Sequence, residues 1–141
     1  HIAFYQPPYL FIGDTLFSLG AGRLFEGTAA QMVTSLDLLQ NLPEDTLLCC
    51  GHEYTLDNLR FASWLLPQED WGPLLAEFSA QRQAGKPTLP TRWGLEKKYN
   101  PFLRYDDPLL WQAAEAQSGQ PVQDRVTAWQ VVRQLKDHFS S

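Results

Sequence analysis

Residues 46–59 read TLLCCGHEYTLDNL, and this stretch decides the fold. Its first part, residues 46–50, is a short apolar run typical of a buried strand, and His52 follows the end of that run. From Thr55 onward, apolar residues recur at the spacing of a helix face. We therefore predict that the chain changes from α/β to helical character near Tyr54.

The segment before this change predicts strands, a loop and one helix. Residues 2–5 and 9–12 are apolar and rich in aromatics, and the prolines between them indicate two strands joined by a turn. Three glycines within residues 20–27 predict a loop. Thr28 can cap a helix over residues 28–40, where apolar residues recur at helical spacing. This alternation is typical of an α/β unit.

The segment after the change is predicted to be helical. We expect helices from Thr55 to Pro67, from Pro73 to Ala84, from Pro108 to about Gly119, and over residues 124–139. A proline-rich loop should separate the second helix from the third, with no further strand. The predicted fold class is thus α/β plus all-α, with domains at residues 1–54 and 55–141.

Composition excludes several classes of function. The 141 residues are 44% hydrophobic and 19% charged, with a net charge of −5, so the chain should fold and should not be a general nucleic-acid binder. It contains no apolar run of the roughly 20 residues that cross a bilayer, so we expect no membrane association. The only cysteines, Cys49 and Cys50, are adjacent in an apolar run, which favours free thiols and a cytoplasmic location.

Asp14 and His52 are the first candidate site residues. Each follows an apolar strand-like run, at the strand end where α/β proteins usually bind ligands. Taken singly, Asp14 has the ordinary interpretation of a turn residue, and His52 that of a structural histidine. Taken together, a carboxylate and an imidazole after two strands of one unit favour a shared metal site.

Five strings then carry a resemblance over nearly the whole chain. They are FIGDTLF (11–17), GRLFEGT (22–28), CGHEYT (50–55), NPFLR (100–104) and RQLKD (133–137). In order and spacing they resemble glyoxalase II, the hydroxyacylglutathione hydrolase family of the metallo-β-lactamase superfamily. The resemblance implies the C-terminal part of a metallo-β-lactamase αββα domain, followed by a helical glutathione-binding domain.

The resemblance also implies an activity and a cofactor. The family hydrolyses the thioester S-D-lactoylglutathione to D-lactate and glutathione, in the detoxification of methylglyoxal. By resemblance, Asp14 bridges two divalent metal ions and His52 binds the second. Zinc is the expected metal, with iron or manganese as alternatives. A water held between the ions would lose a proton and attack the thioester carbonyl, so no side-chain nucleophile is needed.

Substrate-binding residues are implied in the same way. Glutathione carries two carboxylates, so its site should offer cations and hydroxyl donors. The resemblance assigns this role to Arg23, Tyr54, Arg133 and Lys136. Arg133 and Lys136 are three apart and share a helix face, although a solvated basic face near a helix end would show the same spacing. We expect the protein to be a monomer.

Two departures from the family pattern limit these expectations. Phe25 stands where some members have Tyr, so a hydroxyl contact is lost there. The Thr-His-x-His-x-Asp-His metal motif is missing, and His1 resembles a neighbouring non-ligand His, so we expect the sequence to be part of a longer protein. Alone, it should bind zinc weakly and hydrolyse no thioester. The alternatives are another esterase or thioesterase of the same fold, and a non-catalytic module that binds glutathione conjugates.

Overall fold

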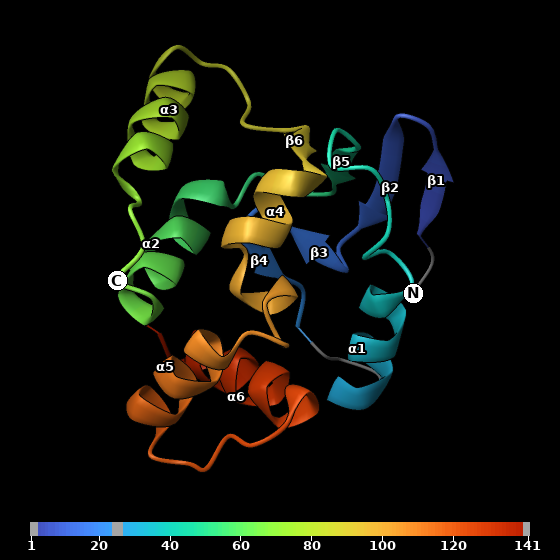
Figure 1. Ribbon diagram of the computed structural model, residues 1–141. Helices are drawn as coiled ribbons and strands as arrows, with labels where there is room; N and C mark the ends of the chain where they lie inside the picture. The colour runs from blue at the N-terminus through green and yellow to red at the C-terminus, as the bar shows by residue number, and fades with distance from the viewer. Residues whose placement is uncertain (1–2, 24–26, 140–141) are drawn as a thin grey trace.

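A computed structural model describes residues 3–23 and 27–139 of the chain (Figure 1). Its main feature is a four-stranded mixed sheet in the order β1-β2-β5-β6. The strands are β1 (Phe4–Gln6), β2 (Tyr9–Gly13), β5 (Leu47–Cys50) and β6 (Thr91–Arg92). β2 runs parallel to β5, whereas β1 and β6 pair antiparallel at the two edges. The parallel central pair is what brings two strand ends to the same edge of the sheet.

A second, smaller hairpin follows β2. It consists of β3 (Leu16–Phe17) and β4 (Gly20–Ala21). The prediction of a loop over residues 20–27 is therefore wrong at its start, because two residues of that stretch pair with β3. Phe25 and His1 lie outside the described residues.

The α/β part is completed by helix α1 (Ala29–Asp37), which lies between β4 and β5 in the chain. Thr28 caps it as predicted: its hydroxyl accepts from the backbone N–H of Gln31, and the Gln31 side chain accepts from the backbone N–H of Thr28. The helix ends at Asp37, three residues before the predicted end at Gln40. Met32 and three other residues on the same face are buried, as an amphipathic helix requires.

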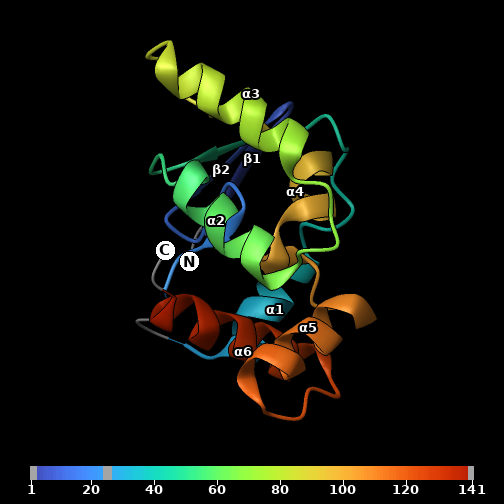
Figure 2. The same cartoon turned by 90° about the vertical axis from the view of Figure 1, so that its left-hand side faces the viewer.

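The rest of the described chain is mainly helical. Its elements are α2 (Thr55–Leu65), α3 (Gly72–Gln83), α4 (Trp93–Tyr99), the 3₁₀ turn η1 (Pro101–Leu103), α5 (Pro108–Ser118) and α6 (Arg125–His138). Turning the molecule by 90° shows α5 and α6 side by side at one end, α3 at the other end, and α2 between them (Figure 2). An α/β segment followed by helices is the predicted fold class, and it is confirmed.

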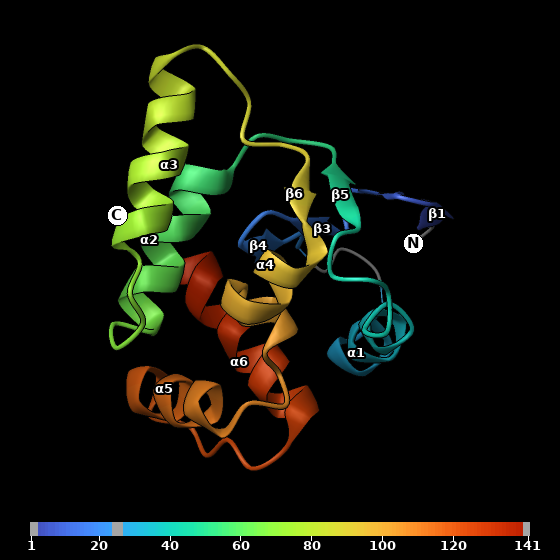
Figure 3. The same ribbon diagram turned by 45° about the horizontal axis from the view of Figure 1, so that its top comes forward.

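Two elements contradict the prediction of a proline-rich loop without further strands. β6 returns to the sheet and pairs with β5, and α4 follows it directly (Figure 3). β6 is two residues long, too short to show a period of its own. It pairs with Leu47 and Leu48 of β5 and so covers an edge of that strand that would otherwise be unpaired.

The buried carboxylate of Glu96 joins the sheet region to the helical region. It accepts hydrogen bonds from the Ser18 hydroxyl, the Leu19 N–H, the Thr91 hydroxyl and the Asn100 amide, at 2.8 to 3.1 Å. Glu96 is fully buried. The two segments therefore share a polar network as well as apolar contacts, and the boundary near Tyr54 stays a prediction.

Candidate functional site

Asp14 and His52 meet at the carboxyl ends of the two parallel strands. Asp14 follows β2 and His52 follows β5, and His52 Nδ1 lies 2.8 Å from Asp14 Oδ1. Their side chains are 66% and 51% exposed, respectively. The structure therefore brings the Asp14 and His52 side chains together, as expected from the sequence, and leaves both accessible to solvent.

Glycines hold the backbone around Asp14. Gly13 has a φ of 58°, a left-handed conformation that lets the chain turn outward at the end of β2. The Gly51 N–H donates to the Gly13 carbonyl at 2.8 Å and the Gly22 N–H to the Thr15 carbonyl at 3.1 Å. A Cβ on Gly22 would collide with the Asp14 carbonyl. Two separate segments, at Gly22 and at Gly51, are thus fixed against the Asp14 turn.

Aromatic rings support the imidazole. The Tyr54 ring stacks on His52 with centroids 5.2 Å apart and planes 2° apart, and Phe17 meets both rings edge-on. Phe17 is buried, whereas Tyr54 is 44% exposed. The stack fixes the plane of the imidazole while leaving the Tyr54 ring open to a ligand.

Three cations lie at the other end of the site. The Arg133 guanidinium donates to the Ala21 carbonyl at 2.7 Å and pairs with Asp137 at 2.9 Å. Arg23 lies 3.6 Å from the same Asp137 carboxylate. Lys136 is one helical turn from Arg133, and its ammonium lies 5.9 Å from the ring centroid of Phe61.

Burial sets the acid–base character of these groups. It lowers the pKa of the Lys136 ammonium, and the positive charge of Arg133 lowers it further. Burial also lowers the pKa of Arg133, against the opposing charge of Asp137. Cys50 ends β5 close to the site, but burial raises the pKa of its thiol to about 11, so it is not a thiolate nucleophile at neutral pH.

All six residues singled out from the sequence line one cavity of about 680 Å³. They are Asp14, Arg23, His52, Tyr54, Arg133 and Lys136. The carboxylate and imidazole come from the sheet edge, the cations from β4's continuation and from α6, and Tyr54 from the start of α2. The geometry therefore offers an acid-and-imidazole end and a cationic end within one space.

The donor set at the sheet edge suits a divalent metal. A carboxylate oxygen and an imidazole nitrogen are ordinary zinc ligands, and both side chains are accessible. Within residues 3–23 and 27–139, no group of three or more His, Cys, Asp or Glu side chains could hold a metal. Asp14 and His52 are therefore compatible with a metal centre as part of its ligand set.

Sequence reasoning missed Asp137 and Phe17. Phe17 lies in the string FIGDTLF (11–17) and Asp137 in RQLKD (133–137). The signal for Asp137 was present, since it lies four residues after Arg133 on a helix, the spacing of an ion pair. Phe17 carried no such signal, because its contacts with His52 and Tyr54 depend on the tertiary fold.

Comparison with known proteins gives matches to a single family. A family model described as "Hydroxyacylglutathione hydrolase C-terminus" matches residues 53–139. A hydroxyacylglutathione hydrolase of Photorhabdus laumondii is 54% identical over 107 residues, which cover 76% of this chain and 43% of the relative.

Two further relatives match almost the whole chain. Hydroxyacylglutathione hydrolases of Hamiltonella defensa and of a Synechococcus species are 46% and 49% identical, respectively, over 99% of this chain. These matches cover 55% and 54% of the two relatives. The chain thus spans about half the length of the curated relatives that it matches.

Proposed function

Because the chain belongs to the hydroxyacylglutathione hydrolase family, we propose that it forms part of an enzyme that hydrolyses S-D-lactoylglutathione to D-lactate and glutathione. Its share of the work is to bind the glutathione moiety and to supply two metal ligands. The observation that carries the proposal is the cavity in which Asp14 and His52 face the same space as the cations of α6.

We assign the metal end to Asp14 and His52. Asp14 has two carboxylate oxygens and so can serve two ions, whereas His52 offers one nitrogen to one ion. Two divalent ions are proposed, with zinc expected. When bound, they would act as Lewis acids toward water and toward the thioester carbonyl. Tyr54 holds the His52 ring in plane by stacking, which keeps its ligand nitrogen directed at the site.

The cationic end is assigned to the glutathione moiety. Lys136, Arg23 and Arg133 are placed to bind its carboxylates, and the Tyr54 hydroxyl to donate a further hydrogen bond. Binding there would anchor the tripeptide and hold the thioester toward Asp14 and His52. Positioning of this kind contributes to catalysis without covalent chemistry by the protein.

The test is kinetic and uses the full-length gene product. We expect Lys136→Ala to raise KM for S-D-lactoylglutathione by about tenfold to a hundredfold, the effect of losing one charge-assisted contact. Asp14→Asn should instead lower kcat, because it acts at the metal end. A KM left unchanged by Arg133→Ala and Lys136→Ala together would mean that the substrate is a different ester or thioester.

The cysteines bear on the cellular setting of the protein. Cys49 and Cys50 are both free thiols, which supports our proposal of a reducing, cytoplasmic compartment. No helix in the described part of the chain has the length and apolar character needed to cross a membrane. A monomeric state stays a prediction.

A further inference from the structure

One carboxylate outside the predicted site contacts two of its three cations. Asp137 lies on α6, and its Oδ1 is 2.9 Å from Arg133 Nη2 and 3.6 Å from Arg23 Nε. The Asp137 side chain is 36% exposed, between the buried Arg133 and the exposed Arg23. The same oxygen thus joins a residue of α6 to a residue of the segment that follows β4.

Arg133 is held from both sides. Its Nη1 donates to the carbonyls of Ala21 and Gly22, at 2.7 and 3.2 Å, while its Nη2 donates to Asp137. The Arg133 side chain is only 8% exposed, and burial of an unpaired guanidinium is costly. The geometry makes Asp137 the counter-charge that keeps this buried cation in place.

Arg23 has fewer constraints. Its side chain is 67% exposed, and Asp137 is the one ion-pair partner that it has among the described residues. A long, exposed arginine carries about 2 kcal/mol of rotamer entropy, which is lost when it binds a ligand. A nearby carboxylate reduces this loss by restricting the side chain before the ligand arrives.

We propose that Asp137 is a positioning residue of the glutathione site, and that its single carboxylate orients Arg133 and Arg23 for the anionic end of the substrate. The proposal rests on the proposed function. Asp137 is not itself among the residues that line the cavity in the described chain. It acts through the two arginines, and therefore on substrate affinity more than on the chemical step.

Charge alone predicts the opposite outcome, which makes the proposal testable. Removing a negative charge beside three cations strengthens the attraction for an anionic substrate, and a purely Coulombic role for Asp137 would lower KM when it is neutralised. A positioning role would raise KM, because the arginines lose their alignment. The sign of the change in KM therefore separates the two roles.

The experiment measures kcat and KM of the full-length gene product for S-D-lactoylglutathione, and its affinity for free glutathione by calorimetry. For Asp137→Asn we expect KM and the glutathione Kd to rise about tenfold, as for one lost charge-assisted interaction, with kcat within about twofold. Glu77→Gln, on the exposed face of α3, makes the same charge change away from the site and should leave both constants unaltered. An unchanged or lowered KM in Asp137→Asn overturns the proposal.

A double-mutant cycle supplies the second arm. Because Arg23 is exposed, Arg23→Gln should fold normally, and in that background Asp137→Asn should raise KM by clearly less than in the wild type. Fully additive effects would exclude action through Arg23. If Asp137→Asn does not fold, Asp137→Glu keeps the charge but shifts it by one methylene, and a KM equal to that of the wild type would then count against positioning. A wild-type protein that neither hydrolyses the thioester nor binds glutathione refutes the proposed function instead.

Discussion

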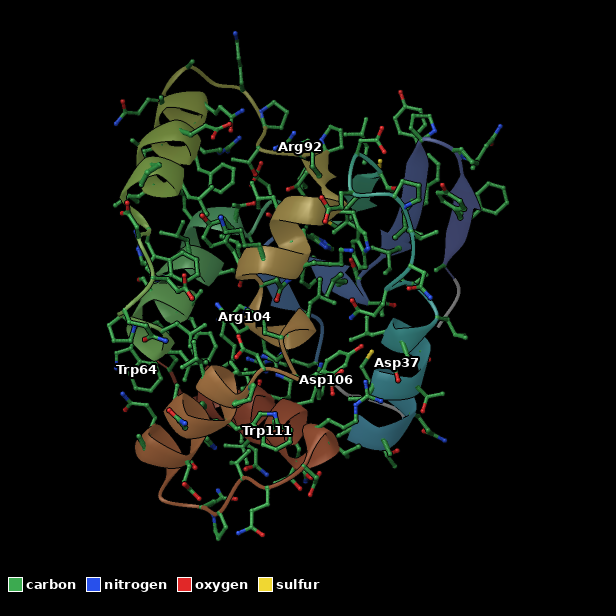
Figure 4. All side chains as sticks on the ribbon, in the orientation of Figure 1. Asp37, Trp64, Arg92, Arg104, Asp106 and Trp111 are labelled. Atoms are coloured by element: carbon green, nitrogen blue, oxygen red, sulfur yellow. The ribbon has the colours of Figure 1, made fainter. Side chains whose placement is uncertain are left out.

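Arg125 of α6 donates two parallel hydrogen bonds to Asp37 of α1, both 2.7 Å long: Arg125 Nη1 donates to Asp37 Oδ2, and Arg125 Nη2 to Asp37 Oδ1. The residues are 88 positions apart. Arg125 also bonds Asp106, and Figure 4 labels Asp37 and Asp106, the two carboxylates that it bridges. The Tyr105 hydroxyl donates to Asp37 at 2.8 Å. This cluster joins the α/β segment to α6, the helix that also carries Arg133 and Lys136.

We predict that Arg125→Met lowers the free energy of unfolding by about 1 kcal/mol, a modest value because the side chains involved are partly exposed. The Arg125 hydrogen bonds lower the pKa of Asp37 below its ordinary value of 3.8. Their contribution to the free energy of unfolding is therefore fully present when the pH is above 3.8, and it is lost as the pH falls through the lowered pKa. Denaturant unfolding of both proteins at several pH values measures this. Arg82→Met on α3 is the control, and an equal loss in the two variants would contradict the prediction.

The buried Glu96 gives a second prediction. Glu96→Ala removes the acceptor of four hydrogen bonds and should cost about 3 kcal/mol or more of stability, since buried donors would be left unpaired. Glu96→Gln, which keeps the shape, should cost less. Burial outweighs the hydrogen bonds and raises the pKa of Glu96, so its favourable contribution falls as the pH rises above the ordinary value of 4.5. The stability deficit of the Gln variant should therefore shrink over that range, and a growing deficit would refute this reasoning.

The two networks also mark the limit of what the sequence can predict. Asp14 and His52 could be paired in advance, because each follows a strand and parallel neighbours end at one edge. Arg133 and Lys136 could be placed on one face because helical spacing is a local property. Glu96 lies in a short helix and accepts a hydrogen bond from Ser18, which is 78 positions away. No local sequence pattern predicts that hydrogen bond. The same applies to β6, whose pairing depends on the edge left by β5.

Metal binding provides a third prediction, on this chain alone. With two ligands from the described residues, zinc should bind with a dissociation constant weaker than about 1 µM. His52→Ala should weaken it further. Competition with a zinc indicator dye measures both, and the same dye assay on the full-length gene product should give a much tighter value. Tight binding by the chain alone would mean that the ligand set is different from the one proposed.

The lowered pKa of Lys136 leads to a fourth prediction. Burial and the charge of Arg133 make the ammonium lose its proton at a lower pH than an ordinary lysine, whose pKa is 10.5. KM for the thioester should therefore rise on the alkaline side earlier than an ordinary lysine would allow. Lys136→Arg keeps its charge throughout this range, so its KM should stay flat. Initial-rate kinetics from pH 7 to about 10 compare the two profiles, and parallel profiles would show that Lys136 does not control binding.

Tyr54 combines two roles that substitution can separate. Its ring stacks on His52 at 5.2 Å, while its hydroxyl is free to serve the substrate in our proposal. In the full-length gene product, Tyr54→Phe keeps the stack, so zinc affinity should be unchanged while KM rises about fivefold to tenfold for one lost hydrogen bond. Tyr54→Ala removes the ring as well, frees the imidazole to rotate, and should weaken zinc binding in addition to raising KM. Zinc titration and thioester kinetics on the two variants distinguish the roles, and equal zinc affinities for Tyr54→Phe and Tyr54→Ala would show that the stack does not orient His52.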